Sequence, residues 1–127
     1  MYVIVLARWF ACTVVLCVVC TTTLQAGACG YSHCWGAVAV APDGAAARSS
    51  GLRTAHQAWK RANRACGGKC KVIEPFSDGC GAIVTDRDQA AWPGFAGTRD
   101  GAIAEATASC AWSPGRGCRV RIWACSR

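Results

Sequence analysis

Short runs of small and β-branched apolar residues, separated by turn residues, divide the chain after residue 34. This composition is typical of strands, and Pro42-Asp43-Gly44 is typical of a tight turn. The predicted strands are residues 35–41, 45–50, 69–76, 80–85 and 118–125. The stretch 90–96 contains Pro93 and Gly94, so we expect an edge strand or a loop there.

Two other stretches repeat alanine at helical spacing. The first follows Thr54, whose hydroxyl can cap a helix, and should end at Cys66, before two glycines. Its predicted apolar stripe is Ala55, Ala58, Trp59, Ala62, Ala65 and Cys66. The second helix should follow Thr98 and run to Cys110. Its predicted stripe is Ala102, Ile103, Ala106 and Cys110.

The chain contains an internal repeat. Cys34-Trp35-Gly36-Ala37 is matched by Gly79-Cys80-Gly81-Ala82, and the two helical stretches align without a gap. Each half reads strand, strand, helix, strand. We therefore predict an α+β fold with two ββαβ repeats, residues 35–79 and 80–127, that form one mainly antiparallel sheet with both helices on one face.

These motifs resemble the bacterial domain-of-unknown-function family 4189. The resemblance rests on the two repeat starts, the alanine-rich helices, Cys70-Lys71-Val72 and the terminal Trp123-Ala124-Cys125. It covers nearly all of the chain after residue 28. It implies a small exported bacterial protein and carries over no reaction, cofactor or catalytic residue. The chain departs from the family pattern in Cys29 and Cys34, and in a tight turn where a longer aromatic hairpin is usual.

Residues 1–28 have the pattern of a secretory signal peptide. Arg8 precedes an apolar run from Trp9 to Cys20, which is shorter than the roughly 20 residues that a membrane span needs. Cleavage could follow Ala26 or Ala28. We therefore expect a secreted or periplasmic protein, with residues 29–127 as a single domain.

The cysteine count favours an oxidising compartment. Cleavage would leave eight of the 11 cysteines, an even set that can form four disulfides. Lipidation of Cys29 is the alternative, but it would leave one thiol unpaired. Equivalent places in the repeat predict Cys66–Cys70 and Cys110–Cys118. A Cys80–Cys125 pair would then fasten the last strand and leave Cys29 with Cys34. Since large apolar residues are few, the cross-links should be needed for stability.

Catalytic and metal chemistry find little support in the sequence. The cysteine spacings fit zinc poorly, and sequence neighbours such as His33 and Cys34 rarely form a catalytic pair. His56 falls in the first turn of a helix, where an exposed role is ordinary. Asp86 and Asp88 flank Arg87 in what has the composition of a solvated loop. We predict no cofactor, no metal site and no catalytic residue.

Positive charge is the remaining signal. Without Arg8 the chain has 13 basic and seven acidic residues. Lys69 and Lys71 follow a basic helix, and the period of two should place three residues of the last strand on one side. The candidate anion-binding residues are Lys60, Arg61, Arg64, Arg119, Arg121 and Trp123. Charge and cation–π contact could hold an anionic ligand there, or these residues could simply be solvated.

The sequence therefore predicts a non-enzymatic, exported interaction or effector-type protein. Its partner would be a protein or an anionic surface of unknown identity, without specific nucleic-acid binding and without a transmembrane segment after signal cleavage. The alternative is a periplasmic or secreted enzyme or inhibitor whose pocket lies between the repeats.

Overall fold

The computed structural model describes residues 28–127, so the predicted signal peptide, apart from its last residue, lies outside the described part. The elements are β1 (Trp35–Val40), β2 (Ala46–Leu52), α1 (Ala55–Ala65), β3 (Val72–Ser77), β4 (Gly79–Thr85), β5 (Ala91–Ala96), α2 (Arg99–Cys110) and β6 (Arg119–Ser126). The order ββαβ occurs twice, which confirms the α+β class and the two repeated units.

Both helices begin at the predicted threonine. The Thr54 hydroxyl accepts the Gln57 N–H at 3.2 Å, and the Thr98 hydroxyl accepts the Gly101 N–H at 3.1 Å. Each bond satisfies one of the N–H groups that a helix start leaves without a partner. After α1 the chain turns at Gly67, whose φ of 60° suits a residue without a Cβ.

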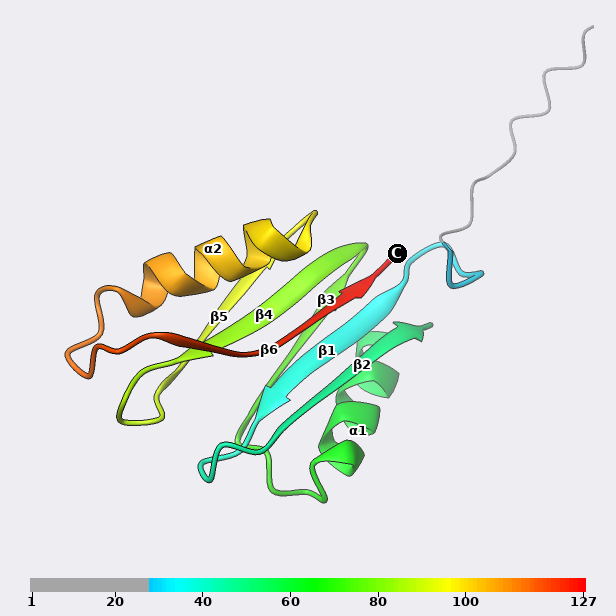
Figure 1. The fold of residues 1–127 in the computed structure, drawn as a ribbon. Coiled ribbons are helices and arrows are strands. Elements are labelled where there is room, and N and C mark those ends of the chain that lie inside the picture. Colours follow the sequence, from blue (N-terminus) through cyan, green and yellow to red (C-terminus); the bar gives the residue numbers. More distant parts are fainter. Residues whose placement is uncertain (1–27) are drawn as a thin grey trace, which may run out of the picture.

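The strands form two antiparallel sheets of three, in the orders β2-β1-β3 and β5-β4-β6. This differs from the single sheet that we predicted. The positions of the helices also differ from the prediction. Each helix lies on the outer face of its own sheet, whereas we expected both on one face of a single sheet (Figure 1). From one side to the other, the layers are α1, the first sheet, the second sheet and α2 (Figure 1).

The central strands explain this arrangement because both of their faces are apolar. In β1, Ala37 and Ala39 pack towards α1, whereas Val38 and Val40 belong to the core between the sheets. One helix can cover only one face of a sheet, so the other two faces pack together. The core between the sheets consists of Val38, Val40, Phe76, Ile83 and Ala124, with Val72, Ala91 and Ile122 partly buried beside it.

Small residues bring the helices close to their sheets. Ala58 and Ala62 of α1 are fully buried, as are Ala102 and Ala106 of α2. The stretch 91–96 is an edge strand, one of the two alternatives that we expected there, and a Cβ at its Gly94 would overlap the backbone of α2. The predicted stripe of α1 was too wide, because Trp59 is 40% exposed. The contact with the sheet is filled by Ala58, Ala62 and Cys66.

Hydrogen bonds join the two halves along β2 and β6. Arg48 in β2 donates to the Trp123 carbonyl in β6 at 3.1 Å, and the Gly51 N–H donates to the Ser126 hydroxyl at 2.9 Å. The Cys29 N–H also donates to the Arg127 carbonyl at 3.1 Å. The last strand is therefore held both by its own sheet and by the first half.

All eight cysteines of the described residues form disulfides. The pairs are Cys29–Cys34, Cys66–Cys70, Cys80–Cys125 and Cys110–Cys118. They are the four pairs that we predicted, two from the repeat and two from the cysteines that it leaves. Neither helix within residues 28–127 is long and apolar enough to cross a membrane.

Candidate functional site

The predicted anion-binding residues separate into two groups on different layers. Lys60, Arg61 and Arg64 belong to α1, on the outer face of the first sheet. Arg119, Arg121 and Trp123 belong to β6 in the second sheet. They therefore form two candidate sites instead of one.

The first candidate is a basic segment, residues 53–71, that comprises α1 and its flanks. It contains six basic residues and no acidic residue, whereas the rest of the described chain has seven of each. The basic residues are Arg53, Lys60, Arg61, Arg64, Lys69 and Lys71, and all six are exposed. The net positive charge of residues 28–127 thus equals the charge of this one segment.

Two depressions lie along the exposed side of α1, and both are lined by Lys60 and Arg64. The first, of about 310 Å³, is also lined by Trp59, Asn63, Gly67 and Gly68. The second, of about 370 Å³, is also lined by Tyr31, Leu52, Gln57 and Arg61. Aromatic rings beside cations give a surface that can contact both the charges and the flat groups of a ligand.

The second group, Arg119, Arg121 and Trp123, does not lie on one side of β6, although the alternation of strand side chains predicted this. A β-bulge falls opposite Ile83 and Val84, and it interrupts the alternation of β6 at Arg121. The Arg121 guanidinium donates to the Gly44 carbonyl of the first half at 2.9 Å, whereas Trp123 packs on the α2 side of its sheet. The two side chains therefore do not form one site.

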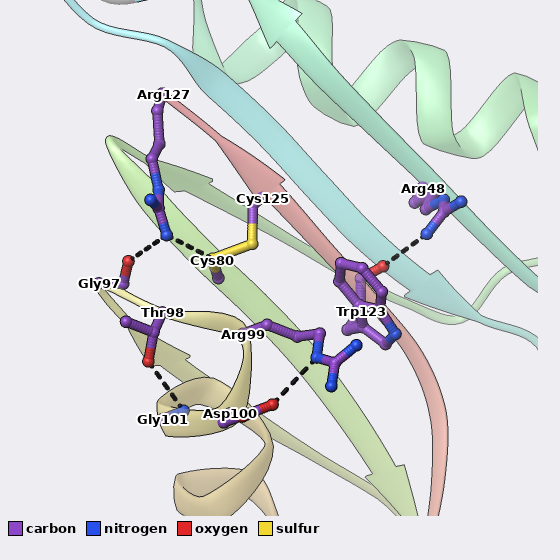
Figure 2. The surroundings of a disulfide bond; sticks show 10 residues. All are labelled: Arg48, Cys80, Gly97, Thr98, Arg99, Asp100, Gly101, Trp123, Cys125 and Arg127. Carbon is purple, nitrogen blue, oxygen red and sulfur yellow. Dashed lines mark hydrogen bonds and ion pairs between the residues drawn. A yellow bond between two sulfur atoms is a disulfide. The ribbon is translucent and has the colours of Figure 1, made fainter.

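Trp123 has other cationic neighbours. Figure 2 shows the indole flanked by Arg48 and Arg99, whose guanidinium carbons lie 5.6 and 5.0 Å from the ring centroid. Arg99 also pairs with Asp100 at 3.0 Å, in the first turn of α2. The ring is partly buried against the α2 core, so its contacts hold β6 to α2 and to β2.

Arg119 and Arg121 line the same cavity. Its third arginine, Arg87, was not predicted from the sequence. A cavity of about 210 Å³ at the start of β6 is lined by both, together with Arg87 and Gln89 from the β4–β5 turn. Arg87 was not among the predicted residues, because the turn and the strand are more than 25 residues apart in the sequence. Only the pairing of β4 with β6 brings them together.

Asp86 was predicted to lie in a solvated loop, but its side chain is only 4% exposed. Its carboxylate accepts the Ser113 hydroxyl and the N–H groups of Asp88 at 2.9 Å and Ala90 at 3.0 Å. The Ser113 hydrogen bond, followed by those of the two N–H groups, lowers the pKa of Asp86 below its ordinary value of 3.8. Asp86 therefore organises the β4–β5 turn as a charged group.

Neither histidine lies beside a free thiol in the described chain, because Cys34 is joined to Cys29. His33 instead contacts Asp78 at 2.6 Å, and the Asp78 carboxylate accepts the Cys34 N–H at 2.9 Å. This backbone N–H, and then His33, lower the pKa of Asp78. His56, with Trp59 and Pro75, lines a shallow apolar depression beside α1. The two contacts of Asp78, with His33 and with the Cys34 N–H, tie the amino-terminal loop to the β3–β4 turn.

A family model described as a domain of unknown function (DUF4189) matches residues 35–125. The chain belongs to this family. The match spans both repeats and all six strands, apart from the last residue of β6. The family assignment agrees with the resemblance drawn from the sequence. A search of curated proteins gives no significant match.

The chain is also similar to a solved structure, the NMR structure of Rv1813c from Mycobacterium tuberculosis. The two are 31% identical, with a TM-score of 0.55. The similarity covers 72% of this chain and 74% of the other. The family and this neighbour support the fold. Neither description names a biochemical role.

Proposed function

We propose that this member of the family is an exported, non-enzymatic interaction protein that binds a polyanionic partner through the basic segment 53–71. One observation carries the proposal: the excess positive charge lies on this segment, without an acidic residue within it. A surface of one sign attracts an oppositely charged partner from a distance and increases the rate of encounter. The four disulfides are in keeping with an oxidising compartment.

The interior between the halves supports an interaction protein over the alternative of an enzyme or inhibitor with a pocket between the repeats. Val38, Phe76 and Ile83 fill the space between the two sheets, with exposed fractions of 0%, 6% and 0%. A buried cleft at that place would need these side chains to move. The accessible chemistry lies on the outside of the fold, where α1 presents its cations.

Retention on immobilised heparin tests the proposal. We expect retention that weakens as salt rises, because exposed charges are screened. A double variant, Arg61→Gln with Arg64→Gln, should elute at clearly lower salt than the parent. The matched control, Arg87→Gln with Arg119→Gln, removes the same charge far from α1 and should elute close to the parent.

Two results would contradict the proposal. Equal losses in both double variants would mean that heparin responds only to net charge. A loss confined to the control would place the polyanion at the arginine cavity instead. Non-reducing electrophoresis and circular dichroism of each variant would establish that the disulfides and the fold are intact.

A further inference from the structure

A second cationic site lies at the opposite end of β4 from the Cys80–Cys125 disulfide. This arginine cavity, of about 210 Å³, lies where β4 ends, the β4–β5 turn follows and β6 begins. Its lining residues are Thr85, Asp86, Arg87, Gln89, Gly117, Arg119 and Arg121. Apart from Gly117, each of these residues has a polar or charged side chain.

The charges of the cavity do not cancel. Asp86 is its one acidic lining residue, and the carboxylate already accepts the Ser113 hydroxyl and two backbone N–H groups. Within residues 28–127 the ion pairs are His33–Asp78 and Arg99–Asp100, so none involves an arginine of the cavity. The lining therefore contains three guanidinium groups and one carboxylate, whose hydrogen bonds go to Ser113 and to its own turn. The net charge of the lining is about +2.

One of the three arginines is held by a side-chain hydrogen bond, and a second lies close to the chain beside it. Arg121 donates to the Gly44 carbonyl at 2.9 Å, which uses one of its five N–H groups. Arg87 lies against Gly117, where a Cβ would come within 2.7 Å of its Cγ and Nε atoms. The backbone N–H of Arg87 donates to the backbone carbonyl of Arg116 at 2.9 Å, which ties the β4–β5 turn to the chain before β6. Because its side chain is already held by the Gly44 carbonyl, Arg121 loses less entropy when it binds a ligand.

We propose that the arginine cavity binds a phosphate group. Guanidinium groups recognise phosphate through paired N–H donors, and Gln89 and Thr85 add neutral hydrogen-bonding groups to the lining. A phosphate monoester carries about −1.5 to −2 charges at neutral pH, which matches the net charge of the lining. A single carboxylate would leave about one positive charge uncompensated. This site is distinct from the basic segment on α1.

Titration with inorganic phosphate, followed by NMR of the backbone amides and arginine Nε–H groups, tests the assignment. We expect saturable shifts centred on Arg87, Gly117 and Arg119. Arg87→Gln or Arg119→Gln should each weaken binding about tenfold or more, because a hydrogen bond to a charged group is lost. The control, Arg61→Gln with Arg64→Gln, removes two charges from α1 and should leave the dissociation constant within about twofold of the parent.

The outcomes separate the possibilities. Absence of saturation, or equal weakening in the cavity variants and the α1 control, would overturn the proposal. A phosphate monoester such as glycerol phosphate that binds as well as inorganic phosphate would indicate the terminal phosphate of a larger ligand. Exclusion of the ester would indicate free phosphate. Arg121 is not substituted, because its bond to Gly44 joins the two halves.

Discussion

At the scale of single residues, Phe76 packs into the core between the sheets because two glycines leave room for its ring. A Cβ at Gly36 would lie 2.7 Å from the Phe76 Cζ, and a Cβ at Gly81 would lie 2.6 Å from its Cδ1. Gly36 and Gly81 are equivalent positions of the repeat. The repeat therefore supplies one glycine from each half to the same aromatic ring.

Gly81→Ala tests this contact. We expect a loss of about 1–3 kcal/mol in the free energy of unfolding, because the added methyl group overlaps a ring that is only 6% exposed. In a Phe76→Leu background the same substitution should cost less, since the smaller side chain leaves space. Urea unfolding of the four proteins in this cycle measures the coupling.

Gly97→Ala is the matched control for that cycle. A Cβ at Gly97 would meet nothing within 4 Å, so the substitution should change stability by no more than about 0.5 kcal/mol. If Gly81→Ala cost the same with Phe76 and with Leu at that position, the ring would not be the obstacle.

At the scale of elements, Asp86 joins the β4–β5 turn to the loop between α2 and β6. Its carboxylate accepts the Ser113 hydroxyl from that loop and two N–H groups from its own turn. Because the folded pKa lies below the unfolded value of 3.8, the carboxylate stabilises the fold above that pH. The stabilisation is lost as the pH falls through the folded pKa.

Asp86→Asn should therefore flatten the acid limb of the stability curve. We expect a lower Tm than the parent at pH 7, and a smaller fall in Tm between pH 5 and about pH 2, since one titrating carboxylate is gone. Asp78, whose pKa is also lowered, keeps part of the acid dependence in both proteins. Thermal unfolding followed by circular dichroism measures both quantities.

The control for Asp86 lies in the same turn. Asp88→Asn removes an equal charge from an exposed side chain and should follow the pH profile of the parent more closely. Parallel curves for the parent and Asp86→Asn would mean that the Ser113 bond does not depend on the charge of Asp86.

The elements also show which features local sequence could predict. Helix starts at Thr54 and Thr98 were predicted because a cap depends on residues within one turn. The bulge in β6 was not predicted, because it arises from pairing with β4, which lies about 40 residues earlier in the sequence. The same distance in sequence concealed Arg87, which joins Arg119 and Arg121 only when β4 and β6 are adjacent.

At the scale of the molecule, the repeat predicted two equivalent halves but not how they meet. We predicted one wide sheet, but alternating Ala and Val in β1 gives the strand two apolar faces. Two packed sheets form instead, because each sheet has one helix and the uncovered faces can bury only one another. Consequently, the predicted cations of α1 and β6 lie on separate layers (Figure 1).

The disulfides should differ in their contribution to stability according to the chain they enclose. Cys80–Cys125 closes a loop with a sequence separation of 45, whereas Cys66–Cys70 has a separation of 4. Loop-closure entropy gives roughly 4 kcal/mol for the long ring and roughly 2 kcal/mol for the short one. The long ring also anchors β6, whose bonds to β2 join the two halves (Figure 2).

Paired alanine variants test this ranking. Cys80→Ala with Cys125→Ala should lose more free energy of unfolding than Cys66→Ala with Cys70→Ala, as measured by urea unfolding followed by tryptophan fluorescence. Equal losses of unfolding free energy in the two variants would mean that the hydrogen bonds between strands alone hold β6.

Non-reducing peptide mapping tests the pairing itself. Peptides that joined Cys66 to Cys80 or to Cys125 would contradict it.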